Sequence, residues 1–219
     1  MEFDENLGLI WLEGGESYYD TNEDRIVNIV DFYWDKFFTN ANITEISSAG
    51  SHVVALDSNG KVWTWGVNDD GQLGDGSETR SDIPVCISNI EGNPLKGIKI
   101  VQVSAGGRYT VAIDSNGKVW TWGSNSAGKL GDGSETSSTI PICISNIQGN
   151  PLNGIKIEQI SAGEDHTVAI DSNGKVWTWG WNSAGQLGDG SETENPIPIC
   201  ISDIEGNPLK GIKIEQVSA

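Results

Sequence analysis

The sequence has few basic side chains and no long apolar run. It carries 13 Lys and Arg residues against 31 Asp and Glu residues, which gives a net charge of −18. Nucleic-acid binding depends on cationic side chains that displace counterions from phosphates, so this balance argues against a nucleic-acid partner. Polar residues interrupt every apolar stretch before the roughly 20 residues that cross a bilayer, so we expect no membrane partner. The acidity suits a basic protein partner, or it serves only to solvate the surface.

Cysteine and histidine are also sparse, with three and two residues. Cys86, Cys143 and Cys200 lie 57 residues apart in the sequence, each in an equivalent Ile-Pro-(Val/Ile)-Cys-Ile segment. Equivalent positions in successive units are too far apart for a disulfide, so we expect three small buried apolar side chains. No further Cys or His stands at the spacing of a metal site, so we expect no metal and no cofactor.

The first residues do not have the pattern of an export signal. Met1-Glu-Phe-Asp-Glu5 is acidic, whereas a secretory signal begins with basic and then apolar residues. If Met1 is the natural start, we expect a cytoplasmic protein. Residues 1–42 hold ten carboxylates against Arg25 and Lys36, so the acidity is concentrated in this region.

Glycine, in contrast, is plentiful, and it punctuates a repeat. The segment Asp114-Ser-Asn-Gly-Lys-Val-Trp-Thr-Trp-Gly123 recurs 57 residues before and 57 residues after. Its Asn-Gly pair lies between two apolar runs, which predicts a β-hairpin. The two-residue period of a strand places Trp120 and Trp122 on one face. We therefore expect each copy to present a pair of indoles on one side of its sheet.

Such indole faces need a neighbouring unit to cover them. A buried Trp removes about 150–250 Å² from water, worth roughly 4–6 kcal/mol as an upper bound. We expect packing between successive units, although a carbohydrate-stacking platform is an alternative. The residues concerned are Trp63, Trp65, Trp120, Trp122, Trp177 and Trp179.

Four strands are expected in each regular unit. In the central copy they cover 98–104, 110–114, 118–123 and 140–145, joined by Gly-rich turns. Pro141 removes a backbone donor, so the fourth strand should lie at an edge or begin there. Four short antiparallel strands in a unit of about 40–60 residues are typical of a β-propeller blade.

Residues 1–42 carry a degenerate form of the same unit. They match its second, third and fourth strands, with Ile26-Val-Asn-Ile-Val30 as the fourth. The alternative for this last segment is an amphipathic helix with an apolar face from Ile26 to Phe37. Val217-Ser-Ala219 matches a first strand, so the two chain ends together would complete a fourth blade. We expect residues 1–219 to form a single propeller domain.

Five elements in fixed order give this chain a family resemblance. The succession Ser161-Ala-Gly163, His166-Thr-Val-Ala-Ile170, Gly174 to Gly180, Asn182 to Gly190 and Pro198 resembles the regulator of chromosome condensation repeat. The resemblance implies an all-β propeller of four-stranded antiparallel blades, with seven blades in the best-known members. This chain has three regular repeats and one degenerate blade. A four-bladed ring, a homo-oligomer closed through the chain ends and part of a larger ring all remain open.

Function is sought where the near-identical copies differ, because packing should hold equivalent scaffold residues constant. The differences fall in expected loops, where recognition residues usually lie. Trp181 is the sharpest candidate, since an exposed Trp is a typical binding anchor, although it could instead fill space between blades. The acidic pair Asp69-Asp70 does not have the spacing of a calcium loop. The candidate binding residues are His52, Asp69, Asp70, Arg108, Tyr109, Asp165, His166 and Trp181.

Catalysis finds no support in the sequence. His52 and His166 share a repeat position with Tyr109, so no common chemistry requires histidine there. Nucleophile, phosphate-binding and metal-ligand motifs are missing, so we name no catalytic residue. The leading hypothesis is a non-enzymatic protein–protein interaction scaffold. The resemblance implies two alternatives, nucleotide exchange on a small GTPase and inhibition of an enzyme by the propeller loops.

Overall fold

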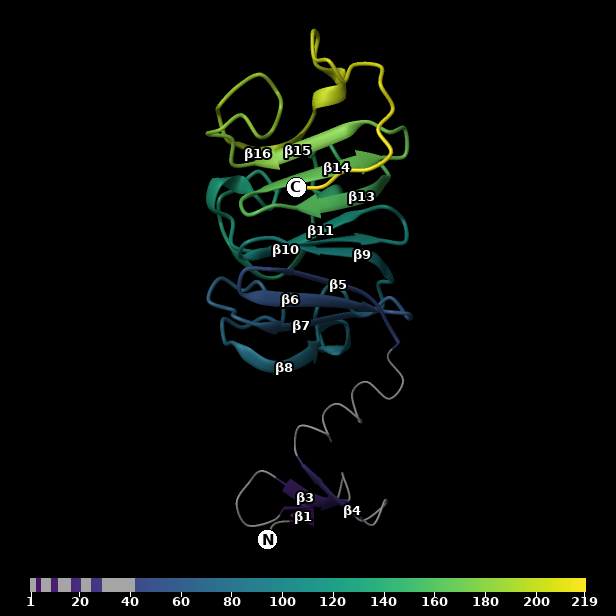
Figure 1. Ribbon diagram of the computed structural model, residues 1–219, viewed down its shortest axis with the longest axis vertical. Coiled ribbons are helices and arrows are strands. Elements are labelled where there is room, and N and C mark those ends of the chain that lie inside the picture. Colours follow the sequence, from purple (N-terminus) through teal and green to yellow (C-terminus); the bar gives the residue numbers. More distant parts are fainter. Residues whose placement is uncertain (1–2, 5–8, 12–16, 21–24, 29–41) are drawn as a thin grey trace. The chain divides into compact units, whose positions relative to one another are not determined.

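The computed structural model describes residues 3–4, 9–11, 17–20, 25–28 and 42–219. The chain divides into two compact units, Met1–Asn42 and Ile43–Ala219. The described residues form four sheets, each of four antiparallel strands (Figure 1). This confirms the all-β fold class, while the single domain expected over 1–219 stays a prediction.

The described residues of the first unit form one more strand than we expected. Its sheet has the order β1-β2-β3-β4, with β1 at Phe3–Asp4, β2 at Leu9–Trp11, β3 at Ser17–Asp20 and β4 at Arg25–Asn28. The additional strand is β3, at a point where the regular repeats predict no strand. All four strands come from residues 3–28, so this sheet differs from the expected blade shared by the two chain ends. A strand, not a helix, covers Ile26, whereas the rest of the competing helix lies outside the described residues.

The second unit consists of three sheets that follow one another along the chain, and we call them blades 1, 2 and 3 (Figure 1). Each blade pairs its four strands in sequence order, as a propeller blade does. Blade 1 contains β5 (Ile43–Ala49), β6 (His52–Asp57), β7 (Val62–Gly66) and β8 (Ser81–Cys86); blade 2 contains β9 (Ile100–Ala105), β10 (Tyr109–Asp114), β11 (Val119–Gly123) and β12 (Ser138–Cys143); blade 3 contains β13 (Ile157–Ala162), β14 (His166–Asp171), β15 (Val176–Gly180) and β16 (Asn195–Cys200).

The position of a strand within its blade decides what it can contact. The first strands of adjacent blades lie against each other, β5 against β9 and β9 against β13. The fourth strands β8, β12 and β16 form the opposite edges of the sheets, so Pro141 lies in an edge strand as expected. Each fourth strand runs into a short 3₁₀ turn, η1 at Ile87–Asn89, η3 at Ile144–Asn146 and η4 at Ile201–Asp203.

One buried aspartate organises each hairpin between the second and third strands. In blade 2, Asp114 Oδ1 accepts the backbone N–H groups of Asn116 and Lys118 at 2.8 and 3.1 Å. Its other oxygen accepts the indole N–H of Trp120 at 3.2 Å. Asp57 and Asp171 make the same three bonds in blades 1 and 3. The Asp-Ser-Asn-Gly segment therefore fixes the first indole of the pair as well as the turn.

One buried asparagine organises each Gly-rich loop that follows the third strand. Asn125 donates its amide N–H groups to Asp132 Oδ1 at 3.1 Å and to the carbonyls of Ser134 and Thr136 at 3.0 and 3.1 Å. Its amide oxygen accepts the N–H of Leu130 at 2.9 Å. Asn68 and Asn182 make equivalent bonds in the other blades. A single side chain thus closes a loop of about ten residues.

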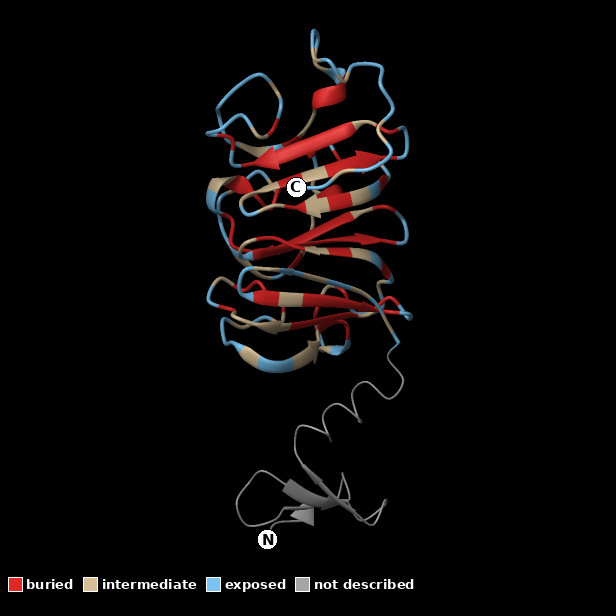
Figure 2. Cartoon of the chain, viewed as in Figure 1, coloured by how far each residue is buried: buried red, intermediate tan, exposed pale blue. Residues whose placement is uncertain are grey.

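The core lies between the blades. Trp122 and Trp179 are 0% exposed, and each donates its indole N–H at 3.0 Å to a carbonyl of the preceding blade, that of Gln72 or of Lys129. A Cβ at Gly131 would lie 2.7 Å from the Trp179 indole nitrogen, so only glycine allows this approach. Figure 2 shows the buried residues running along the strands and the exposed residues in the loops.

Two apolar clusters fill the two junctions. Trp120 and Trp122 belong to the cluster between blades 1 and 2, and Trp177 and Trp179 belong to the cluster between blades 2 and 3. The indoles of blades 2 and 3 therefore face the preceding blade. Trp63 is 4% exposed, whereas Trp65 is only half-buried because its face of blade 1 looks away from blade 2.

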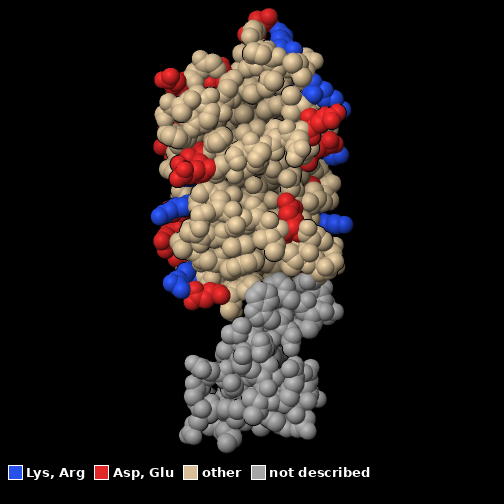
Figure 3. All heavy atoms as spheres, viewed as in Figure 1, with Lys and Arg blue, Asp and Glu red and all other residues tan. Residues whose placement is uncertain are grey.

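Charge is unevenly spread over the surface of the second unit. On the face shown in Figure 3, charged side chains gather along the two long sides and leave the middle uncharged. Residues 43–219 hold 21 acidic and 11 basic side chains, a net charge of −10. The long sides, where the loops lie, are therefore where electrostatic recognition can take place.

Candidate binding groove at the loop ends

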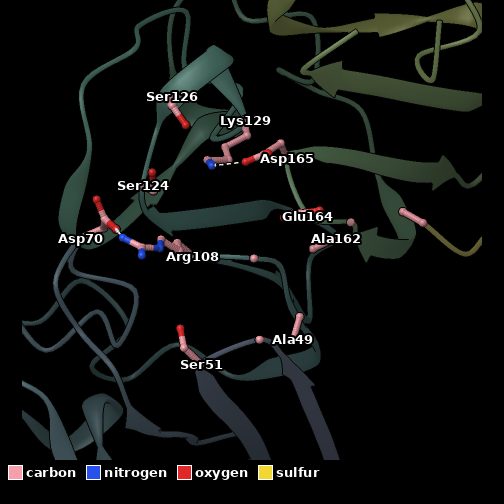
Figure 4. Close-up of a pocket in the computed structure, with 14 residues that line it drawn as sticks. Ala49, Ser51, Asp70, Arg108, Ser124, Ser126, Lys129, Ala162, Glu164 and Asp165 are labelled. Atoms are coloured by element: carbon pink, nitrogen blue, oxygen red, sulfur yellow. Dashed lines mark hydrogen bonds and ion pairs between the residues drawn. The ribbon is translucent and has the colours of Figure 1, made fainter. Parts of the chain in front are cut away.

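A groove of about 920 Å³ runs across the loop ends of all three blades. Its walls come from the turns between the first and second strands and from the Gly-rich loops after β7 and β11 (Figure 4). We call this cavity the groove. Its polar lining side chains include Ser51, Asp70, Arg108, Ser124, Ser126, Lys129, Glu164 and Asp165.

The backbone brings the blades close together at the groove. Gly107, in the turn between β9 and β10, donates its N–H to the carbonyl of Glu164 at 3.2 Å in the corresponding turn of blade 3. A Cβ at Gly107 would lie 2.7 Å from that oxygen, which no larger residue tolerates. Main-chain contact therefore holds the groove turns of blades 2 and 3 together.

Arg108 and Asp70 form an ion pair between blades 1 and 2. The guanidinium Nη1 lies 3.1 Å from Asp70 Oδ2. The Arg108 side chain is 60% exposed and that of Asp70 is 28% exposed, so solvent screens this pair and it contributes about 0.2–1 kcal/mol. Both candidates predicted from the sequence thus lie in the groove and contact each other, as Figure 4 shows.

Lys129 and Asp165 form the corresponding pair between blades 2 and 3. The ammonium lies 2.5 Å from Asp165 Oδ1 and 5.7 Å from the centre of the Tyr109 ring. The Lys129 side chain is only 4% exposed, against 37% for Asp165. Sequence reasoning missed Lys129 because it lies in a segment read as a turn. The available signal was the single Lys at a position where the other copies have Gln72 and Gln186.

The two ion pairs have opposite polarity. Between blades 1 and 2 the acid, Asp70, comes from the earlier blade, whereas between blades 2 and 3 the earlier blade supplies the base, Lys129. The charged residues that vary between copies thus give each junction its own pair of partners.

Tyr109 and its equivalent in blade 1, His52, lie inside the junctions between the blades. Tyr109 is 0% exposed and donates its hydroxyl to the carbonyl of His166 at 2.6 Å, and burial raises its pKa above the ordinary value. His52 is 2% exposed, and its Nε2 lies 2.9 Å from Thr110 Oγ1. Burial lowers the pKa of His52 to about 4. We therefore assign His52 and Tyr109 to the blade junctions and leave them out of the binding surface proposed below.

The remaining candidates lie beside the groove. His166 is half-buried, and burial lowers its pKa while neighbouring Asp165 opposes the shift. Trp181 is 39% exposed and donates its backbone N–H to the Asp165 carbonyl at 2.9 Å, although it does not line the groove. Asp69 is exposed next to Asp70. Glu164, which the sequence reasoning did not select, lines the groove and is exposed.

Two chemistries find no site in the part of the chain that the structure describes. Within these residues, no three His, Cys, Asp or Glu side chains are grouped as metal ligands. None of the described segments forms a helix with the length and apolarity needed to cross a membrane.

Comparison with known proteins identifies the repeat. The sequence model of the RCC1-like domain matches residues 5–219. The chain belongs to the RCC1-like domain family. This confirms the resemblance drawn from the repeat motifs and agrees with the three propeller blades of residues 43–219.

Several proteins share the RCC1-like domain with this chain. Human E3 ubiquitin-protein ligase HERC2 is 33% identical over 168 residues, which cover 75% of this chain and 3% of HERC2. The ultraviolet-B receptor UVR8 of Arabidopsis thaliana is 32% identical over 168 residues, which cover 76% of this chain and 36% of the receptor. The chain spans less than half of each relative, so the activity of the whole ligase or receptor is not assigned to it.

A solved structure supports the same RCC1-like architecture. Yeast RCC1 (Prp20), in its complex with Kap60, superposes with a TM-score of 0.59 and 27% identity. The match covers 80% of this chain and 39% of the yeast chain. That RCC1-like protein therefore binds another protein, which bears on the function proposed next.

Proposed function

We propose that this RCC1-like chain is a non-enzymatic scaffold for protein–protein interaction, and that the groove binds a partner segment with a basic side chain. The observation that carries the proposal is the position of the variable residues. Arg108 and Asp165 differ between otherwise near-identical copies, and both line one groove across three blades. A rigid repeated frame that presents varied loop residues is typical of repeat proteins that bind other proteins.

The charges in the groove favour a basic group. Its three acidic side chains exceed its two basic ones, and both bases are already paired, with Asp70 and Asp165. Glu164 is exposed and makes no ion pair with any residue in the described part of the chain. A Lys or Arg of the partner would neutralise Glu164 and approach the half-exposed Asp165. The net charge of −10 on residues 43–219 would steer such a partner toward this unit.

The groove and the exposed residues beside it fit the layout of a protein–protein interface. A stable protein–protein interface buries about 800 Å² on each partner and surrounds its centre with a polar rim. The groove would supply the centre, and the exposed Trp181 and Asp69 beside it would supply the rim. An aromatic side chain at the rim adds contact area at low entropic cost.

Charge reversal at Glu164 tests the proposal. Affinity capture would compare wild type with Glu164→Lys, using Glu135→Lys as the matched control, because Glu135 is also exposed but does not line the groove. We expect Glu164→Lys to lose the captured partners and Glu135→Lys to retain them, with unchanged melting temperatures for both. Trp181→Ala would show whether the contact extends to the rim.

Two results would contradict the proposal. An unchanged set of partners for Glu164→Lys would place the interface elsewhere. Accelerated nucleotide release from a small GTPase by the wild-type chain would favour the exchange alternative, which a binding scaffold does not predict.

A further inference from the structure

A second cavity, of about 470 Å³, lies on blade 1 and is lined by three lysines. The hairpin turn before β7, the 3₁₀ turn η1 and the segment that leads into β9 enclose it. Lys61, Lys96 and Lys99 line the cavity together with Ile98. We call it the lysine pocket. The lysines make its lining basic, whereas the whole chain has a net charge of −18.

One lysine of blade 3 and one of blade 2 each have an acidic partner whose position in blade 1 is occupied by a neutral residue. In blade 3, Lys175 pairs with Asp203 at 2.8 Å. Asn89 replaces that aspartate beside Lys61 in blade 1. A neutral residue thus stands where blade 3 supplies a carboxylate.

A carboxylate is also replaced by a neutral side chain near Lys99. In blade 2, Lys156 pairs with Glu158 at 3.4 Å, and blade 3 keeps a glutamate at this position. In blade 1 the position of this glutamate, two residues after Lys99, is occupied by Val101, which is 49% exposed. Within residues 42–219, the ammonium groups of Lys61 and Lys99 make no ion pair and no hydrogen bond, whereas that of Lys96 pairs with Glu91.

The charge at this position therefore changes from blade to blade. Blade 1 has three lysines against one glutamate, a net of +2; blade 2 has two lysines against one glutamate, a net of +1; and blade 3 has three lysines against three carboxylates, a net of zero. The residues concerned are Lys61, Lys96, Lys99 and Glu91; Lys118, Lys156 and Glu158; and Lys175, Lys210, Lys213, Asp203, Glu205 and Glu215.

We propose that the lysine pocket binds an oxyanion, a phosphate or a carboxylate, carried on a partly apolar body. The chain itself shows the geometry, because in blades 2 and 3 its own carboxylates lie within ion-pair distance of the equivalent lysines. A ligand oxyanion takes their place in blade 1, where ammonium groups provide point charges and several donors. The lysine stems and Ile98 form the apolar wall.

This site lies in a different part of the fold from the groove. The two cavities share no lining residue, and the groove is predicted to take a basic group. The oxyanion site therefore does not depend on the function proposed above, and either can fail without the other.

The variants that test the site occur naturally in the other repeats. Asn89→Asp and Val101→Glu restore to blade 1 the carboxylates of blades 3 and 2, so neither should disturb folding. Each adds one negative charge about 4 Å from a lysine, which should weaken oxyanion binding about fivefold. The control, Asn146→Asp, makes the same change at the equivalent position of blade 2 and should leave binding unaltered.

Binding would be followed by NMR during titration of the full chain with inorganic phosphate and, separately, with acetate. We expect the backbone chemical shifts of residues 59–61, 88–89 and 96–99 to change. The comparison of phosphate with acetate shows which oxyanion the pocket binds more tightly. Shifts spread equally over Lys118, Lys156 and the other surface lysines would overturn the proposal. Equal affinity in wild type and Val101→Glu, or no binding of either oxyanion, would also overturn it.

Discussion

The junction between blades 1 and 2 and the junction between blades 2 and 3 share one apolar frame and differ in their polar contacts. In both, an indole of the later blade, Trp122 or Trp179, donates to a carbonyl in the Gly-rich loop of the earlier blade. Around this frame the first junction has a histidine and an exposed ion pair, whereas the second has a tyrosine and a nearly buried lysine.

The shared contacts and the variable contacts of the junctions have different roles. The frame is repeated because burial of the indoles stabilises every junction in the same way. The polar residues vary because each must match only one neighbour. A wrong neighbour would place Asp165 beside Asp70, two like charges, so the variable residues also oppose incorrect packing of the blades.

The largest expected effect comes from removing the shared indole. Trp179→Ala should destabilise the second unit by about 3–5 kcal/mol, because it empties a fully buried site. The matched control is Trp65→Ala, at the equivalent but half-buried position, which should cost about 1–2 kcal/mol. Urea unfolding measures both. Equal losses would show that the junctions do not depend on indole burial.

Acid should weaken the first junction more than the second. His52 has a pKa of about 4 in the folded chain and about 6.5 when unfolded, so its contribution is complete above pH 6.5 and is lost as pH falls from 6.5 to 4. The loss is at most about 3 kcal/mol. Thr110 Oγ1 donates to the Gln72 carbonyl, so it accepts from His52 Nε2, and protonation would bury an Nδ1–H without an acceptor among the described residues.

The measurement is the melting temperature between pH 7 and pH 4. His52→Phe, which cannot titrate, should flatten the loss of stability in this range, even if it lowers stability at pH 7. His166→Gln is the control at the half-buried third position. An unchanged pH slope in His52→Phe would show that other groups cause the acid sensitivity.

Exchange of the groove cations should have unequal effects. Lys129→Gln introduces the residue found in the other blades and should cost about 1–2 kcal/mol, because it leaves Asp165 without its cation. Arg108→Gln should cost about 0.5 kcal/mol or less, since its pair is exposed. Thermal unfolding at low and high salt distinguishes the two. A larger loss of stability for Arg108→Gln than for Lys129→Gln would contradict this ranking, which rests on the burial of the two cations.

The smallest expected effect is a gain in the stability of the first junction. Gln102 bridges blades 2 and 3 by donating to the Ile160 carbonyl and accepting its N–H, both at 3.1 Å. Among the described residues, Glu45, its counterpart, accepts a hydrogen bond only from the N–H of Val103, at 3.4 Å, and burial raises its pKa. Glu45→Gln should supply the missing bond and stabilise the first junction by about 0.5–1.5 kcal/mol.

This gain should depend on pH. Because the folded state favours protonated Glu45, the wild type loses stability as pH rises through the raised pKa, so Glu45→Gln should help more at pH 7 than at pH 4. Denaturant unfolding at the two values measures this. A gain that is equal at both, or absent, would show that the carboxylate is not at a disadvantage.

Much of the fold could be predicted because its causes are local. Asn-Gly turns, the alternation of Trp120 and Trp122, and the missing donor of Pro141 each act within a few residues, and the structure shows the hairpin and the edge strand that they indicate. The strand Ser17–Asp20 was missed, although Gly14-Gly15 precedes it, because the regular repeats have no strand at this point and because its pairing with β2 and β4 decides its conformation.

The site was harder to predict because its contacts join distant residues. Sequence comparison between copies located the variable turns, and Arg108 and Asp165 do line the groove. It could not show that Asp70 pairs with Arg108 across 38 residues, or Lys129 with Asp165 across 36, because these pairs exist only once the blades pack. It could not separate the buried Tyr109 from exposed neighbours either, since both vary between copies.

The asparagine at the centre of each Gly-rich loop makes its outer positions replaceable. The amide of Asn68 holds the loop from within, so Asp69 and Asp70 can become Ser and Ala in the later copies while the hydrogen bonds stay the same. Foreign residues grafted there should leave the loop closed while the local backbone adapts to them, as it does at Ala127, which has a φ of 60°. The repeat thus provides natural sites for randomised libraries, from which binders with new specificities can be selected.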